Sequence, residues 1–91
     1  MRILVEFAWA VAEKVGKKYM WVSLDGEELR IEDLFLKVLA KEAGKEIGEV
    51  LYKLFIDREI LVIVNGVIAV DPGTKLKDGD KVLIQPVASG G

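Results

Sequence analysis

The feature that most constrains the fold is the order in which hydrophobic spacing changes along the 91-residue chain. Both ends show the two-residue alternation of strands, whereas the middle shows the wider spacing of helices. In the first strand-like segment, Ile3, Val5 and Phe7 share one face of an extended chain. This order predicts an α+β fold, with a mixed sheet of about five strands and one or two helices on one face.

The first third of the sequence predicts two strands joined by a short connection. Residues 2–7 form the first strand, and residues 10–15 are rich in alanine and predict about one helical turn that ends at Gly16. Residues 19–24 are rich in aromatic and β-branched side chains and predict the second strand. The turn signal Asp25-Gly26 follows, so we expect the two strands to form an opening hairpin.

Two helices are predicted in the middle of the chain. Residues 31–38 place apolar side chains at positions i, i+3, i+4 and i+7, and Gly44 is the expected end of this helix. Residues 47–55 repeat the pattern with Gly48 among them. A glycine inside a helix costs about 1 kcal/mol relative to alanine, so composition favours the second helix less strongly than the first.

The last third predicts strands again. Residues 60–64 form a continuous apolar run, which is expected of a strand covered on both faces or nearly so. Asn65-Gly66 predicts a tight hairpin turn into residues 67–70. Turn residues between positions 71 and 80 predict a loop, and residues 81–85 predict a closing strand.

The composition excludes several kinds of functional site. The chain contains no Cys and no His, which removes disulfides, thiol nucleophiles, the usual zinc sites and histidine-based catalytic triads. Asp78 and Asp80 flank a glycine, and we interpret them as turn residues rather than as a catalytic or metal-binding pair. The sequence therefore predicts no catalytic residue, no metal site and no resident cofactor.

Charge and hydropathy limit the expected partners. The chain has 13 Lys and Arg residues against 15 Asp and Glu residues, a net charge of −2, which gives no electrostatic footprint for nucleic acid. Its longest apolar runs are about six residues, far shorter than a membrane span. We therefore expect a cytoplasmic protein with neither a nucleic-acid partner nor a membrane partner.

The most unusual feature of the sequence is its end, Pro86-Val87-Ala88-Ser89-Gly90-Gly91. We expect a single domain over residues 1–87 and a flexible tail over residues 88–91. One interpretation is a frayed end without a role. The other is that two glycines, which have no side chains, let a terminal carboxylate enter a narrow channel of another protein. Gly91 would then be an unhindered acyl group, open to activation as an acyl-adenylate and to capture by a sulfur or amine nucleophile.

Taken together, these features resemble the β-grasp sulfur carriers, which are relatives of ubiquitin. The residues that carry the resemblance are Val64-Asn65-Gly66, the segment Leu-Lys-Asp-Gly-Asp-Lys-Val at 76–82, Pro86-Val87 and Gly90-Gly91. The family includes the molybdopterin synthase small subunit (MoaD-like) and the thiamine-biosynthesis carrier (ThiS-like). The resemblance covers essentially the whole chain and implies a β-grasp, ubiquitin-like roll.

The resemblance also implies a function. An E1-like activating enzyme would adenylate Gly91 with ATP, and a sulfur donor would convert the adenylate to a thiocarboxylate. In the molybdopterin branch, which the length of residues 44–58 favours, Ser89 and Gly90 would thread into the active site of the large synthase subunit. Gly91 would there donate its sulfur for molybdenum cofactor biosynthesis, and the chain itself would be a non-catalytic carrier.

Three alternatives stay open on the sequence. The chain resembles a thiamine-type carrier as well, and the same activation would serve a ubiquitin-like modifier joined through Gly91 to lysines of other proteins. The third alternative is an interaction module with an idle tail.

Strand parity places Leu83 and Leu4 on the outward side of the sheet, and together with Val87 they are the expected contacts with a partner.

Overall fold

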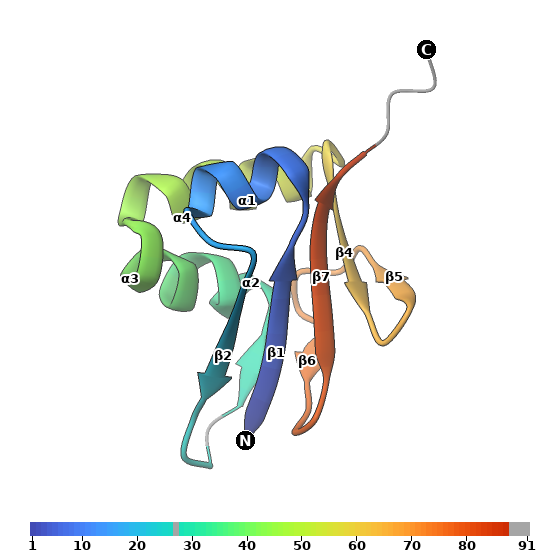
Figure 1. Cartoon of the computed structure of the whole chain (residues 1–91). Helices are drawn as coiled ribbons and strands as arrows, with labels where there is room; N and C mark the ends of the chain where they lie inside the picture. Colours follow the sequence, from blue (N-terminus) through green and yellow to red (C-terminus); the bar gives the residue numbers. More distant parts are fainter. Residues whose placement is uncertain (27, 88–91) are drawn as a thin grey trace.

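Alternating apolar residues build one main mixed sheet, and helices cover one of its faces (Figure 1). The computed structural model describes residues 1–26 and 28–87. Within these residues the main sheet has five strands in the order β2-β1-β7-β4-β5. The five strands are β1 (Arg2–Phe7), β2 (Tyr19–Ser23), β4 (Ile60–Val64), β5 (Val67–Ala69) and β7 (Lys81–Pro86). The predicted α+β architecture is confirmed.

Strands from the two ends of the chain lie side by side at the centre of the sheet. β1 pairs in parallel with β7, with Leu4 opposite Lys81 and Glu6 opposite Leu83. β2 pairs with β1 in the antiparallel sense, and so does β4 with β7. The parallel pair therefore makes the sheet mixed, as predicted, and joins the opening hairpin to the closing one.

The helices follow the predicted order, with one irregularity. Gly16 ends the first helix at a φ of 88°, and Gly44 separates the next two at a φ of 110°, as expected. The middle of the second helical segment is a π-helix, η1, whose turns are wider than those of an α-helix. Among the described residues, no helix has both the length and the apolar composition needed to cross a membrane. The helical elements are α1 (Trp9–Val15), α2 (Ile31–Asp33), η1 (Leu34–Leu39), α3 (Ala40–Ala43) and α4 (Lys45–Ile56).

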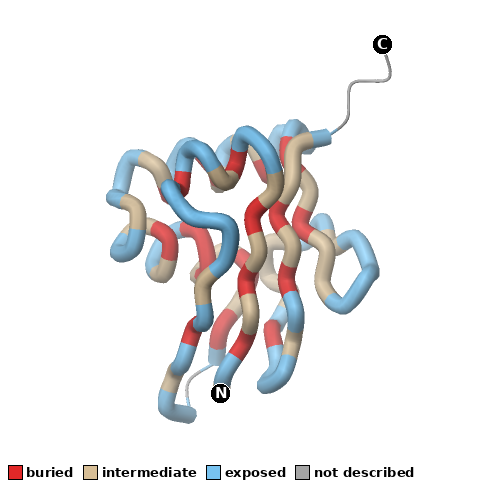
Figure 2. The backbone as a smooth tube through the Cα atoms, in the orientation of Figure 1, coloured by how far each residue is buried: buried red, intermediate tan, exposed pale blue. Residues whose placement is uncertain are grey.

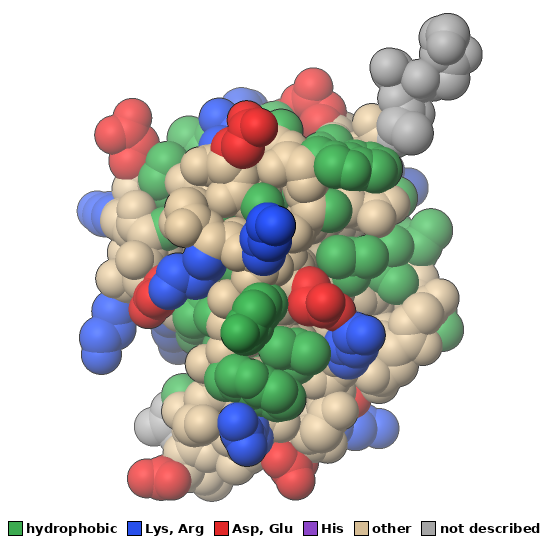
Figure 3. Space-filling model, viewed as in Figure 1, with side chains coloured by type: hydrophobic (Ala, Val, Ile, Leu, Met, Phe, Trp, Pro, Cys, Tyr) green, Lys and Arg blue, Asp and Glu red, His purple; other side chains and the backbone are tan. Residues whose placement is uncertain are grey.

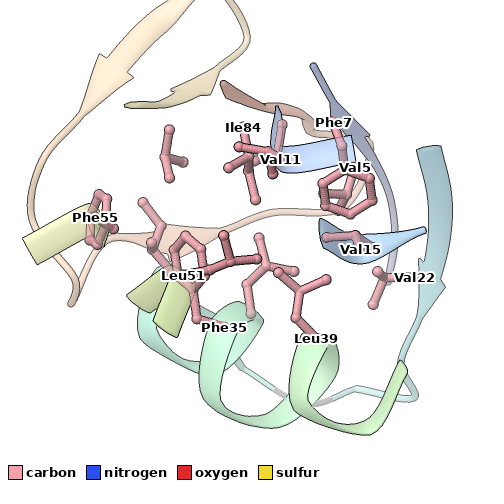
Figure 4. Close-up of a cluster of buried hydrophobic side chains, with 14 of the residues drawn as sticks. Val5, Phe7, Val11, Val15, Val22, Phe35, Leu39, Leu51, Phe55 and Ile84 are labelled. Atoms are coloured by element: carbon pink, nitrogen blue, oxygen red, sulfur yellow. The ribbon is translucent and has the colours of Figure 1, made fainter. Parts of the chain in front are cut away.

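The core lies between the sheet and the helices. Buried positions alternate along the strands (Figure 2), and their side chains point toward those of the helices (Figure 4). Val82 and Ile84 of β7 are fully buried, as strand parity predicts. On the helical side, Phe35 stacks on Phe55 with 5.4 Å between ring centroids. This contact fixes η1 and α4 as one layer against the sheet.

A second, smaller sheet was missed by the sequence prediction. The segment predicted as a loop at residues 71–80 contains β6 (Lys75–Leu76), which pairs with β3 (Leu29–Arg30). Leu76 is only 3% exposed and so contributes to the core. A strand of two residues is too short to show a periodic pattern, which is why the sequence indicates only turns here.

The two faces of β4 differ in burial. The apolar run at residues 60–64 was expected to be covered on both faces or nearly so, and Leu61 and Ile63 are half-buried. Ile60 and Val62 face the helices and are 4% and 0% exposed. Because the helices cover one face of the sheet, the apolar side chains of β4 on the other face are less completely buried than Ile60 and Val62.

Gly48 marks a close approach between α4 and the segment formed by η1 and α3. A Cβ atom at this position would lie 2.5 Å from the carbonyl oxygen of Phe35 and 3.0 Å from the amide nitrogen of Ala40. Both atoms belong to the backbone and cannot rotate away, so a side chain here would push the helices apart. Helix packing therefore explains why α4 contains a glycine despite the low helix propensity of this residue.

Gly48→Ala is expected to lower the free energy of unfolding by about 1–3 kcal/mol, because overpacking outweighs the ~1 kcal/mol that alanine gains in helix propensity. Denaturant-induced unfolding would measure the change. Lys53→Ala, at an exposed position of the same helix, is the control and should change the free energy by less than about 0.5 kcal/mol. A more stable Gly48→Ala variant would contradict the close approach.

Candidate functional site

β7 carries the described chain to one end of the sheet, beside α1 (Figure 1). The N–H of Val87 donates a hydrogen bond of 3.1 Å to the carbonyl oxygen of Glu59. On the other side of β7, the N–H of Ala8 donates a bond of 3.0 Å to the carbonyl oxygen of Ile84. Val87 itself is exposed, at 42%. The fold therefore holds the chain from both sides up to its last described residue.

The predicted carrier residues Ser89, Gly90 and Gly91 lie outside the described residues, as does the whole of the expected tail at 88–91. Their role stays a prediction that rests on the sequence. The structure contributes the position and exposure of Val87, the residue from which the tail continues.

The face of the sheet turned away from the helices, called the outer face below, carries apolar side chains from every strand of the main sheet. Figure 3 shows them as separate groups with charged side chains between them. Several are unusually open, since Tyr19, Trp21 and Ile68 are 52–59% exposed. Large apolar side chains that gather on one exposed face are a feature of interaction sites. The apolar residues that the strand register places on the outer face are Leu4, Tyr19, Trp21, Leu61, Ile63, Ile68 and Leu83.

Both strand residues that the sequence predicts as partner contacts lie on the outer face. Leu83 lies between Glu6 of β1 and Ile63 of β4. Leu4 lies beside Trp21 of β2. Leu4 and Leu83 are diagonal neighbours rather than a direct pair, so they belong to two adjacent apolar groups on one surface. Their role in binding a partner remains a prediction.

A charged pair lies between the two apolar groups, and a shallow hollow lies beside this pair and Leu83. The ammonium of Lys81 lies 3.3 Å from a carboxylate oxygen of Glu6. The hollow has a volume of about 290 Å³ and apolar walls on one side. It suits a side chain with an apolar stem and a polar tip, presented by another protein. The residues that line it are Glu6, Ile63, Asn65, Gly66, Lys81 and Leu83.

The aromatic residues of the outer face were not identified from the sequence as part of the site. Trp21 is 52% exposed, and the guanidinium of Arg2 lies 4.1 Å from its ring centroid in a cation–π contact. Trp9, at the start of α1, is 67% exposed. The register of the first hairpin sets Trp21 opposite Leu4, and this register is seen only in the structure.

Asp78 and Asp80 have the turn function that the sequence predicts. Asp78 accepts a hydrogen bond of 2.8 Å from the backbone N–H of Arg2. Asp80 accepts one of 2.7 Å from the backbone N–H of Lys77 and one of 2.8 Å from the side-chain amide of Asn65. Over residues 1–26 and 28–87, no three Asp or Glu side chains are grouped closely enough to hold a metal ion. The two carboxylates thus stabilise the turn that leads into β7.

Asp80→Ala is expected to lower the free energy of unfolding by about 1–2 kcal/mol, because two hydrogen bonds to a carboxylate are lost at an exposed turn. Thermal unfolding would measure the loss, with Glu46→Ala in α4 as the control at less than about 0.5 kcal/mol. A stability equal to that of the control would mean that the carboxylate does not hold the turn.

The class of the protein follows from this architecture. A mixed sheet with a parallel central pair, helices on one face and an open outer face defines a β-grasp, ubiquitin-like domain. The model of the ThiS family matches residues 12–91. The chain belongs to the ThiS family of small sulfur carrier and ubiquitin-like proteins, and it is a carrier rather than an enzyme. Carriers of this family are thiocarboxylated after adenylation.

Solved structures share the fold over the whole chain. SAMP1 from Haloferax volcanii is 24% identical with a TM-score of 0.73, and the match covers 100% of both chains. A putative molybdopterin converting factor subunit 1 from Pyrococcus furiosus is 21% identical with a TM-score of 0.70, covering 97% of this chain and 99% of that one. A complex of subunits 1 and 2 of the molybdopterin-converting factor from Helicobacter pylori contains a chain 20% identical with a TM-score of 0.61, with both chains covered completely. The curated proteins contain no match.

Proposed function

We propose that the chain is a sulfur carrier whose Gly91 carboxylate is adenylated and converted to a thiocarboxylate that supplies sulfur for molybdopterin. The observation that carries the proposal is the position of Val87. It is the last described residue, its N–H is bonded to the carbonyl oxygen of Glu59 beside β4, and it is exposed; the sequence continues from it to Gly90 and Gly91. Four further residues extend at most ~14 Å, enough to enter the active site of a partner that docks on the body.

The chemistry that the proposal assigns to Gly91 has two steps. A carboxylate oxygen attacks the α-phosphorus of ATP, pyrophosphate leaves, and an acyl-adenylate forms. A sulfide-level sulfur donor then attacks the acyl carbon, and AMP leaves with the oxygen that bridged carbon and phosphorus. The glycine lacks a Cβ and leaves the acyl carbon open to both reactants. The activating enzyme supplies ATP and the catalytic groups.

The outer face supplies recognition in this proposal. Leu83 and Leu4, with the hollow beside Leu83, contact the E1-like enzyme and then the large subunit of molybdopterin synthase. Val87 lies at the margin where the tail leaves the body. The Helicobacter pylori structure supports this assignment, because a chain with the same fold is there in complex with subunit 2 of its own converting factor.

A second candidate function is protein modification through Gly91. The structural similarity to SAMP1 and to a small archaeal modifier protein from Methanosarcina acetivorans supports protein modification as a candidate function. Activation is the same in both cases, and the two functions differ in the nucleophile, which is sulfur in one and a lysine amine in the other. A thiamine-type carrier is the third candidate, and it shares the thiocarboxylate. Gly-Gly remnants on lysines of cellular proteins would favour the modifier.

Incubation with ATP, an E1-like enzyme and sulfide is expected to exchange one oxygen of the chain for sulfur, which intact mass spectrometry detects. A variant that lacks Gly90 and Gly91 is the control and should keep its mass, since its last residue has a side chain next to the acyl carbon. If the full chain keeps its mass while a known carrier of the family reacts under the same conditions, the proposed function is wrong.

Leu83→Asp is expected to lower the efficiency of activation by about tenfold or more, because it places a charge at the centre of the proposed contact. The measurement is the rate of ATP–pyrophosphate exchange as a function of carrier concentration. Leu36→Asp is the matched control, since Leu36 is 42% exposed on η1 and lies outside the outer face. If both variants lose the same activation efficiency, or neither loses any, the outer face is not part of the contact with the activating enzyme.

A further inference from the structure

A second surface lies at the free edge of β2, where a groove of about 360 Å³ separates this strand from η1 and α3. β2 is the end strand of the main sheet among the described residues. Five consecutive residues at the β2 edge line one side of the groove, so it follows the strand rather than crossing it. The lining residues are Met20, Trp21, Val22, Ser23 and Leu24 on the strand side and Lys37, Val38, Lys41 and Glu42 on the helical side.

The hydrogen-bond pattern determines which backbone groups of β2 point to the free edge. Met1 and Leu24 exchange two backbone hydrogen bonds, of 2.7 and 2.8 Å. At the other end of the pair, Phe7 donates to the carbonyl oxygen of Lys18 at 2.8 Å. Bonded and non-bonded pairs alternate along antiparallel strands. The backbone N–H and C=O groups that point away from β1 are therefore those of Tyr19, Trp21 and Ser23.

The floor of the groove is apolar. Met20, Leu24 and Val38 are partly buried and pack against the core. On a strand added beside β2, alternate side chains would point toward this floor, while the others would point to the outer face. The floor therefore selects apolar side chains at every second position of such a strand.

The helical rim of the groove is positively charged. Lys37 and Lys41 lie one turn apart on it, and the side chain of Lys37 is 77% exposed. Glu42 also lines the groove, but Lys17 forms a salt bridge with it. Asp33 lies 3.4 Å from the ammonium of Lys37 at a site that water screens. A segment with acidic residues complements this rim, whereas a second copy of the chain would bring its own lysines against it.

We propose that the β2 groove binds an extended acidic and apolar peptide segment of another protein as an added strand. The peptide exchanges backbone hydrogen bonds with Tyr19, Trp21 and Ser23, and its apolar side chains lie on Val38 and its neighbours. Its acidic residues face Lys37 and Lys41. This is the β-augmentation mode, in which main-chain bonds supply affinity and alternate side chains supply specificity. The groove is separate from Leu83 and from the tail, so the inference does not depend on the proposed function.

The test is a titration of the ¹⁵N-labelled chain with a synthetic peptide, Val-Ile-Val-Ile flanked on each side by Glu-Asp, followed by NMR. The expected result is a set of shifts confined to β2 and to residues 37–42, with slower hydrogen exchange at the amides of Trp21 and Ser23. A peptide with lysines in place of the acidic residues should bind about tenfold more weakly. N-methylation of alternate peptide bonds should abolish binding, because the added strand then lacks its donors.

Matched charge reversals separate the groove from the general charge of the chain. Lys37→Glu with Lys41→Glu should weaken binding by about tenfold or more. Lys45→Glu with Lys53→Glu on α4 changes the net charge equally, at side chains that are 86% and 79% exposed, and should leave binding unchanged. Equal weakening by both pairs, shifts centred on Leu83, or pairing of two copies through β2 without uptake of peptide would each overturn the proposal.

Discussion

The parallel pairing of β1 with β7 is the contact on which the rest of the structure depends. It joins the first six-residue strand to the last one, so neither hairpin can complete the sheet alone. On the inner side it brings Val5 next to Val82 and Phe7 next to Ile84, which form the centre of the core. On the outer side the same register brings Glu6 next to Leu83. The register of the β1–β7 pair therefore determines both which side chains meet in the core and which lie side by side on the outer face.

Much of this fold could be predicted because its strands and helices are long enough to show their periodicity. The alternation in β1 and the apolar stripe that begins at Ile31 each span several residues, and both elements are where the sequence predicts them. The β3–β6 pair was missed because two residues carry no pattern. The role of Gly48 was also missed, since the sequence shows its low helix propensity but not the backbone atoms of Phe35 that face it.

The candidate site also has features that can be predicted from the sequence and features that cannot. Gly90 and Gly91 and the outward parity of Leu83 can be read from the sequence, because they depend on residue type and local alternation. The hollow beside Lys81, the exposure of Trp21 and the groove at β2 cannot be. All three depend on strand order and register, and the hollow also brings Glu6 together with residues more than fifty positions away in the chain. A free strand edge in particular is a property of the whole sheet and leaves no local signal.

The measurement that tests the central claim most directly follows an oxygen atom of Gly91. The chain is prepared with ¹⁸O in its C-terminal carboxylate and incubated with ATP, an E1-like enzyme and sulfide, and the AMP released is analysed by mass spectrometry. If Gly91 forms an acyl-adenylate that sulfur resolves, one ¹⁸O atom passes from the chain to the phosphate of each AMP. AMP without the label, formed while the enzyme turns over ATP, would show that Gly91 is not the activated group and would contradict the account.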